Sequence, residues 1–255
     1  MPTRTGVKIY GHRGAAGEAP ENTLGGFRHA WDRGTRCFEL DIQLTADREL
    51  VVIHDDRVNR TTGSRGAVSS LTSKELAKLD ARRGTPPWPR REGIPRLSDV
   101  LRALPRAQGW QVEVKKAASP QAKELIIDRL QEILGKLSLR RRVILTSSDR
   151  SFLELARTRL PKVTRGLIAS DFDPLRTAAE LGCSHLLVHI MGCSPGLRLA
   201  AWRQGIALSV WGVNEPTSVK ACYQMRVHSI VTDYPSMAIP LVGQLAGSRS
   251  GAGTR

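Results

Sequence analysis

Short runs rich in β-branched residues alternate with longer amphipathic runs along almost the whole chain. This alternation is typical of a parallel sheet whose strands are joined by crossover helices. About eight such units in 255 residues match the count and size of a (β/α)8 barrel, so the predicted fold class is α/β, a TIM-type barrel. The predicted strands are Val7–Tyr10, Cys37–Leu44, Val51–His54, Trp110–Lys115, Val143–Thr146, Gly166–Ala169, His185–His189, Ala207–Trp211 and Ser229–Thr232.

Helices are predicted between these strands, and several begin with proline, which suits the first turn of a helix. Residues 55–95 break the alternation and are expected to be a small insertion after an early barrel strand, where loops carry function. Within it, Thr72 and Glu75 have the spacing of a capping box. The predicted helices are Asn22–Asp32, Ser98–Leu104, Pro120–Leu137, Ser151–Leu160, Pro174–Leu181, Pro195–Arg203 and Pro216–Met225.

The length is consistent with one domain. A chain of 255 residues buries roughly 70–75% of its unfolded surface, enough for one large core without disulfides or structural metal. We expect the domain to span residues 1–246, insertion included. Residues 247–255 are small, polar and basic, and we expect them to form a flexible tail.

Neither a membrane span nor a disulfide framework is expected. No run approaches the roughly 18 apolar residues that cross a bilayer, and the first residues lack the apolar stretch of a signal peptide. The protein is therefore expected to be soluble and cytoplasmic, without stable membrane insertion. Its cysteines lack the spacing of a zinc site and are expected to be reduced thiols. They are Cys37, Cys183, Cys193 and Cys222.

The chain is strongly basic, with 39 Lys and Arg against 24 Asp and Glu and a formal net charge of +15. Such a charge attracts phosphate compounds, nucleic acid or anionic lipid. Aromatic residues make up only 5% of the chain, which disfavours a surface on which bases stack. We interpret the charge as a dispersed, solvated surface that can steer phosphate, and we expect a small-molecule substrate and no nucleic-acid partner.

Three carboxylates are predicted to lie together. Residues 38–44 alternate strictly between apolar and polar, so Glu39, Asp41 and Gln43 share one face of a strand. In a second short strand Glu113 shares a face with Lys115. Three inward carboxylates from two strands make a site for a hard divalent cation, Mg²⁺ or Ca²⁺. The alternative is a set of buried ion pairs with Lys115 and Arg13.

Two histidines, His12 and His54, fall at predicted strand ends, where the active sites of barrels lie. A single histidine there is more often structural. Two of them near a carboxylate cluster suit acid–base chemistry, because imidazole titrates near neutral pH. Arg13 and Lys115 can supply positive charge for a phosphate, and Arg can bind it through two hydrogen bonds.

In type and order, these residues and their neighbours resemble the motifs of the glycerophosphodiester phosphodiesterase family. The resemblance extends from about Ile9 to Pro235 and implies a (β/α)8 barrel with a small insertion. The matching motifs are His12-Arg13-Gly14, Pro20-Glu21-Asn22-Thr23, Glu39-Leu40-Asp41, His54-Asp55, Arg60-Thr61-Thr62-Gly63, Val112-Glu113-Val114-Lys115, Trp211-Gly212-Val213-Asn214 and Thr232-Asp233-Tyr234-Pro235.

The resemblance also implies a role for individual residues. It places the two catalytic histidines at His12 and His54, and the metal-binding carboxylates at Glu39, Asp41 and Glu113. It implies that Arg13 and Lys115 contact phosphate, that Trp211 lines the pocket near the glycerol, and that Asp233 is structural or supporting. Asn22 is expected to support the substrate site, or alternatively to cap the first helix. The chain departs from the family pattern at Ser98, Ser148 and Gly212, which leaves the preferred head group open.

The implied reaction is metal-dependent hydrolysis of glycerophosphodiesters to sn-glycerol 3-phosphate and an alcohol. In the family the neighbouring glycerol hydroxyl attacks phosphorus through a cyclic phosphate, with one histidine as base and the other as acid. One alternative is a lysophospholipase D-like or sphingomyelinase D-like enzyme acting on lipids, although residues 55–95 argue against the sphingomyelinase branch. Another is a non-catalytic barrel that binds nucleic acid, which the intact histidines and carboxylates disfavour. Oligomeric state, metal identity and the division of labour between the histidines stay open.

Overall fold

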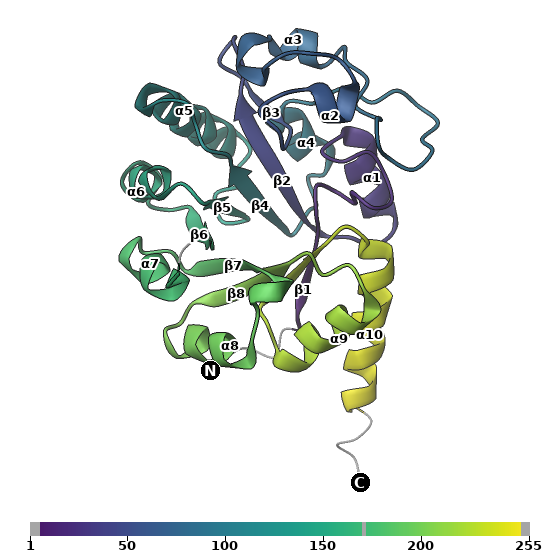
Figure 1. Ribbon diagram of the computed structural model, residues 1–255, viewed down its shortest axis with the longest axis vertical. Helices are drawn as coiled ribbons and strands as arrows, with labels where there is room; N and C mark the ends of the chain where they lie inside the picture. The colour runs from purple at the N-terminus through teal and green to yellow at the C-terminus, as the bar shows by residue number, and fades with distance from the viewer. Residues whose placement is uncertain (1–5, 170–171, 251–255) are drawn as a thin grey trace.

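The computed structural model describes residues 6–169 and 172–250, and it is a closed barrel of eight parallel strands with helices around the outside (Figure 1). Neighbouring strands follow the order β1-β9-β8-β7-β6-β5-β4-β2, and pairing of β1 with β2 closes the ring. The predicted TIM-type fold is confirmed. The barrel strands are β1 (Lys8–Gly11), β2 (Cys37–Leu44), β4 (Gly109–Val114), β5 (Val143–Ser147), β6 (Thr164–Ile168), β7 (His185–His189), β8 (Ala207–Trp211) and β9 (Ser229–Thr232).

The helices that connect the strands lie within a residue or two of their predicted positions. One further helix, α10, was not predicted, because Pro240 lies inside it and it has no clear polar face. It packs against β1 and α9 and includes residues 247–250 of the expected tail, whereas residues 251–255 lie outside the described part. The helices are α1 (Leu24–Asp32), α4 (Leu97–Ala103), α5 (Pro120–Lys136), α6 (Arg150–Arg159), α7 (Pro174–Glu180), α8 (Pro195–Arg203), α9 (Pro216–Met225) and α10 (Pro235–Ser250).

The run predicted as a third barrel strand has another role. β3 (Leu50–Val52) is antiparallel to β2, with Gln43 opposite Val51, so the two strands form a hairpin that extends from the barrel wall. Arg48, in the turn between them, has a φ of 59°, the left-handed conformation that tight hairpin turns require. The extra segment therefore begins at this hairpin, before residue 55, and β3 leads the chain back to the open end of the barrel.

The insertion between β3 and α4 forms its own small unit on that end. It contains α2 (Asn59–Thr62), the 3-10 helix η1 (Val68–Ser70) and α3 (Ser73–Leu76). The predicted capping box is confirmed: the Thr72 hydroxyl accepts from the Glu75 N–H, and the Glu75 carboxylate accepts from the Thr72 N–H. A second hydrophobic core holds this unit together, separate from the main one. Its buried members are Val51, Ile53, Val58, Val68, Leu76, Ala81 and Ile94.

The main core lies between the strands and the outer helices. Phe27 of α1 meets the rings of Phe38 and Trp110 edge-on, with centroids 5.9 and 6.0 Å away. Inside the barrel, below the open end, buried polar side chains bond one another: Gln111 donates to the Ser209 hydroxyl, which also accepts from Ser229. Within the described residues, no helix is both long and apolar enough to cross a bilayer. This scaffold fixes the strand ends that carry the site.

Candidate active site

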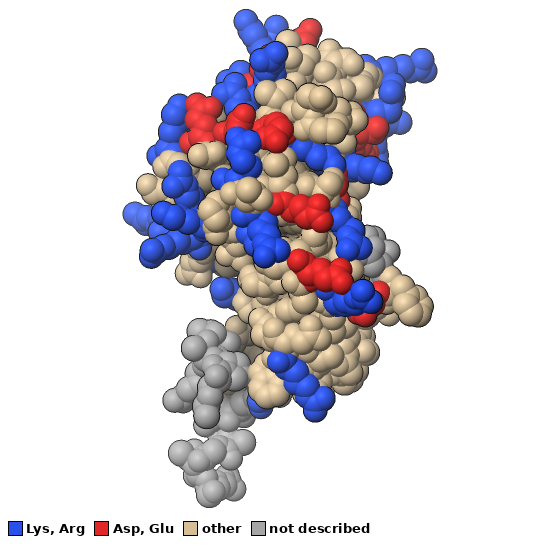
Figure 2. Space-filling model, turned by 90° about the vertical axis from the view of Figure 1, so that its left-hand side faces the viewer, with Lys and Arg blue, Asp and Glu red and all other residues tan. Residues whose placement is uncertain are grey.

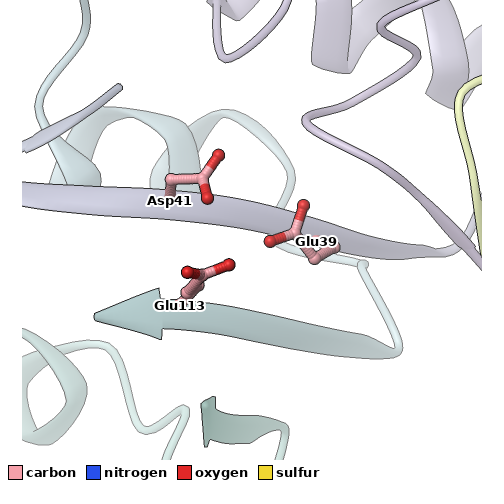
Figure 3. Close-up of side chains that lie close together, drawn as sticks. All are labelled: Glu39, Asp41 and Glu113. Carbon is pink, nitrogen blue, oxygen red and sulfur yellow. The ribbon is translucent and has the colours of Figure 1, made fainter. Parts of the chain in front are cut away.

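The three predicted carboxylates meet at the carboxyl end of the barrel. Glu39 and Asp41 come from β2 and Glu113 from the adjacent β4, and Figure 3 shows their carboxyl groups directed toward a common space. One oxygen of each lies within 4.8 Å of the other two. Asp41 is only 1% exposed and lies opposite Glu113 in the strand register. The alternating patterns of residues 38–44 and 111–115 together therefore predicted this group of carboxylates correctly.

Two cations also touch the cluster. The Lys115 ammonium lies 2.7 Å from Asp41 and 2.5 Å from Glu113, and Arg13 Nε lies 3.3 Å from Asp41. The backbone N–H of Arg13 donates to Glu39 at 3.1 Å. The ion pairs considered as an alternative to a metal site are thus present, but three carboxylates face two cations and a negative charge is left over.

The pKa shifts of the three carboxyl groups show which of them lack a compensating positive charge. Burial and the charge of Asp41 raise the pKa of Glu39 to about 8, and the same two causes raise the pKa of Glu113. Burial has the same effect at Asp41, but Lys115 and Arg13 outweigh it and lower the pKa of that carboxyl. A divalent cation would offset the repulsion that Glu39 and Glu113 experience, and an all-oxygen donor set fits a hard cation. The residues present therefore fit Mg²⁺ or Ca²⁺.

His12 follows β1 and lies beside the cluster. Its Nδ1 donates to Asp233 at 2.5 Å, and its Nε2 lies 3.8 Å from Glu39. Asn214 fixes Asp233 in turn, since its amide donates to the second carboxylate oxygen at 2.6 Å. Burial disfavours the imidazolium, but the Asp233 hydrogen bond and the charge of Glu39 prevail and raise the pKa of His12. The sequence did not predict the contact between His12 and Asp233, because 221 residues separate the two.

His54 reaches the same end from the β2–β3 hairpin. Its carbonyl accepts from the Gln43 amide at 3.1 Å, and its Nδ1 donates to Asp55 at 2.7 Å. Burial lowers the pKa of His54, and the nearby Asp41 opposes this only in part. Each histidine thus binds a carboxylate through Nδ1, and its Nε2 takes no part in that contact.

Arg60 of α2 ties the insertion to the barrel end. Its guanidinium contacts both oxygens of Asp55, at 2.7 and 3.1 Å, and both oxygens of Glu21, at 2.7 Å each. Glu21 also accepts from Arg13 at 3.0 Å. A continuous chain of charged contacts therefore runs from His54 through Arg60 to Arg13. Glu21 and Arg60 each belong to one of the family motifs, and that was the only sign of them in the sequence. Nothing in their spacing along the chain predicted that they would contact each other.

Asn22 supports the cluster and does not cap the first helix. Its amide donates to Asp41 at 2.8 Å, while Thr23 is the residue whose side chain accepts from the Gly26 N–H at the start of α1. Asn22 and Arg13 both have positive φ, 55° and 49°, a conformation that costs free energy in residues other than glycine. Such strain is concentrated in functional loops, and here it directs both side chains at Asp41.

Trp211 stands at the end of β8, on the opposite side of the opening from β2. The edge of His189 meets its ring with centroids 4.4 Å apart. Gly212, with a φ of 74°, makes this contact possible, since a Cβ there would lie 2.7 Å from His189 Nε2. The absence of a side chain at Gly212 therefore leaves room for His189 to pack against Trp211.

Comparison with known proteins places these features in a family. The model of the glycerophosphoryl diester phosphodiesterase family matches residues 12–237. The Bacillus subtilis protein YhdW is 32% identical over 237 residues, which are 91% of this chain and 96% of that protein. A glycerophosphodiester phosphodiesterase of Caldanaerobacter subterraneus is 30% identical over 236 residues, 92% of this chain and 97% of that protein.

Among solved structures, a phosphodiesterase of Oleispira antarctica in complex with the product sn-glycerol-3-phosphate superposes with a TM-score of 0.81. It is 22% identical, and the match covers 92% of this chain and 96% of that one. This likeness supports the barrel fold. The family model spans the His12–Asp233 pair, the carboxylate cluster and the insertion, and the chain therefore belongs to the glycerophosphoryl diester phosphodiesterase family.

Proposed function

We propose that the chain hydrolyses glycerophosphodiesters to sn-glycerol 3-phosphate and a free alcohol, using one divalent cation and two histidines. Family membership supports the reaction class. The product found in the Oleispira antarctica structure supports the same product here. The observation that carries the proposal is that two carboxylate-bound histidines lie at one end of the barrel with a cluster of three carboxylates.

Glu39, Asp41 and Glu113 would hold the cation, Mg²⁺ or Ca²⁺. When bound, it supplies positive charge that offsets the charge of the phosphate. Arg13 and Lys115 would bind phosphate oxygens from the same side, which their contacts with the carboxylate cluster support. Asn22 would keep Asp41 in place, and Trp211 would pack on the glycerol carbons.

The opposite pKa shifts of the two histidines support a division of roles. His54, with a lowered pKa, is neutral near pH 7 and suits a general base, whereas His12, with a raised pKa, suits a general acid. Nε2 of His54 takes the proton of the glycerol 2-hydroxyl, whose oxygen attacks phosphorus. The alcohol leaves with a proton from Nε2 of His12. Water then opens the cyclic phosphate, with the two histidines in reversed roles.

The test is product analysis with purified protein, glycerophosphocholine and Mg²⁺. We expect free choline and glycerol 3-phosphate in equal amounts. We expect His12→Ala and His54→Ala to lower kcat by about 10²–10⁴-fold while circular dichroism stays unchanged. Phosphocholine as product would mean that the other P–O bond breaks and would overturn the proposal. Wild-type turnover by either variant would remove that histidine from the mechanism.

A further inference from the structure

Positive charge collects at the end of the barrel opposite the candidate active site. Seven connections lead from a helix into the next barrel strand at that end, and they contain eight Lys or Arg and no Asp or Glu. By contrast, the seven connections that lead from a strand directly into a helix contain three Lys or Arg and seven Asp or Glu. We call the eight cations the basic face. They are Arg33, Arg36, Arg106, Arg140, Arg141, Arg142, Lys162 and Arg226.

Within the part of the chain that the structure describes, no carboxylate neutralises the basic face. None of its eight cations forms an ion pair there, and all are exposed except Arg36, which is half-buried. Backbone carbonyls fix two of them without removing their charge: Arg36 donates to Trp31 at 2.9 Å, and Arg142 donates to Pro105 at 3.2 Å. Figure 2 looks onto the side of the barrel that carries α5, α6 and α7, where Lys and Arg gather along one edge of the molecule.

Helix dipoles account for only part of the basic face. The carboxyl end of a helix favours cations, but the effect falls off within the last turn. Arg33 and Arg226 cap α1 and α9, whereas the other six cations lie beyond the caps of their helices. Like charges that are collected without partners repel one another, and a bound anionic surface would offset this repulsion.

An aromatic side chain is exposed beside these cations. Trp202 lies in the last turn of α8 and is 51% exposed, and Leu199, one turn earlier on the same side of the helix, is 42% exposed. Because α8 leads into β8, its last turn lies at the end of the barrel that carries the basic face. Tryptophan beside Lys and Arg is typical of protein surfaces that rest among the head groups of a bilayer.

We propose that the basic face docks the protein reversibly on bilayers that contain anionic phospholipid, with Trp202 at the level of the head groups. The eight cations come from five separate connections, so they spread in two dimensions, as the phosphates of a bilayer do. A single-stranded nucleic acid would instead need aromatic residues interleaved with the cations, and Trp202 is the one exposed aromatic residue described at this end. Docking at this end leaves the carboxylate cluster open to water.

The test is sedimentation of the purified protein with vesicles of phosphatidylcholine and with vesicles of phosphatidylcholine mixed with phosphatidylglycerol, at low salt. Wild type should bind only the vesicles that contain phosphatidylglycerol, and added salt should release it, because ions screen exposed charges. The triple variant Arg140→Gln/Arg141→Gln/Lys162→Gln should bind about 100-fold more weakly, since each cation near an anionic bilayer strengthens binding by roughly fivefold.

The matched control is Arg65→Gln/Lys74→Gln/Arg90→Gln. It removes the same charge from three exposed residues of the insertion, at the active-site end, and should bind the vesicles as wild type does. Because all six substituted residues are exposed, both triple variants should keep the wild-type melting temperature. Tryptophan emission should also move to shorter wavelength when wild type binds the vesicles, and Trp202→Ser should lose this change.

Four results would overturn the docking face. They are a wild type that does not bind the phosphatidylglycerol vesicles, equal binding by wild type and the Arg140→Gln/Arg141→Gln/Lys162→Gln variant, equal weakening in the insertion control, and an emission change that persists in Trp202→Ser. The third would mean that net charge alone drives binding, and the fourth that another surface meets the bilayer. Binding of wild type to an RNA oligomer but not to the vesicles would assign the basic face to nucleic acid and overturn the proposal as well.

Discussion

Asp233 accepts a hydrogen bond from Nδ1 of His12 at 2.5 Å, although 221 residues separate them. The contact exists because β9 pairs with β1 and places Thr232 opposite Gly11. His54 has the equivalent partner in its own neighbour, Asp55, at 2.7 Å. Both histidines are thus held in the tautomer that exposes Nε2. Because each histidine has its own carboxylate partner, Asp233 and Asp55 can be substituted one at a time and their effects on the pH dependence of the reaction compared.

Asp233→Asn should move the basic limb of the kcat/KM profile to lower pH. The Asp233 carboxylate raises the pKa of His12, so its removal lowers that pKa, and the proposed acid loses its proton at a lower pH. The acidic limb, which reports His54, should stay in place. A pH–rate profile of wild type and variant checks this. A shift of the acidic limb alone would reverse the roles assigned to the two histidines.

Asp55→Asn should affect the other limb. The hydrogen bond to Asp55 raises the pKa of His54, whereas burial lowers it. Without the Asp55 carboxylate the pKa of His54 falls, so His54, the proposed base, stays neutral to lower pH. The acidic limb of the profile therefore moves to lower pH. The basic limb should not move. The same profile measured beside Asp233→Asn provides the control, and identical profiles for the two variants would contradict the assignment.

Arg60→Lys should lower kcat by roughly 10–100-fold, the effect typical of losing a partner that orients site residues. Lysine cannot contact both Asp55 and Glu21 with the planar fork that Arg60 uses. Because the Arg60 side chain is 48% exposed, the melting temperature should change little. Arg83→Lys is the matched control, since Arg83 is an exposed arginine of the same insertion that reaches only the Asn59 carbonyl, at 3.4 Å, among the contacts described. Wild-type kcat in Arg60→Lys would contradict a positioning role.

Metal binding should stabilise the fold more at high pH than at low pH. Burial and Asp41 raise the pKa of Glu39 from 4.5 to about 8 in the metal-free protein, so the protonated form is favoured by folding. Its contribution to the free energy of unfolding is fully present below pH 4.5 and is lost as the pH rises through about 8. Calorimetry in chelator and in excess Mg²⁺ checks this.

Glu39→Gln is the control for that experiment. In chelator, the free energy of unfolding of the variant should not fall as the pH rises through about 8, because glutamine does not titrate. Mg²⁺ should also stabilise the variant much less than wild type, because glutamine has no negative charge for the cation to neutralise. An equal increase in melting temperature by Mg²⁺ in wild type and Glu39→Gln would place the cation elsewhere.

The sequence was informative where local pattern decides structure. Strict alternation in residues 38–44 placed Glu39 and Asp41 on one face, and the motif order identified the family. It could not predict contacts that depend on barrel closure, such as His12 with Asp233, or the joining of Glu21 to Asp55 by Arg60. β3 was taken for a barrel strand because the composition of Val51–His54 does not encode direction, which the turn at Arg48 sets. α10 was missed because Pro240 normally argues against a helix interior.

The most direct test of the central claim is metal removal and return. Glycerol 3-phosphate release from glycerophosphocholine should stop after exhaustive chelation and return when Mg²⁺ or Ca²⁺ is added, because Glu39, Asp41 and Glu113 offer only oxygen ligands. Zinc should restore it less well, since no cysteine belongs to the described carboxylate cluster. Full activity in protein that metal analysis shows to be free of divalent cations would contradict the account.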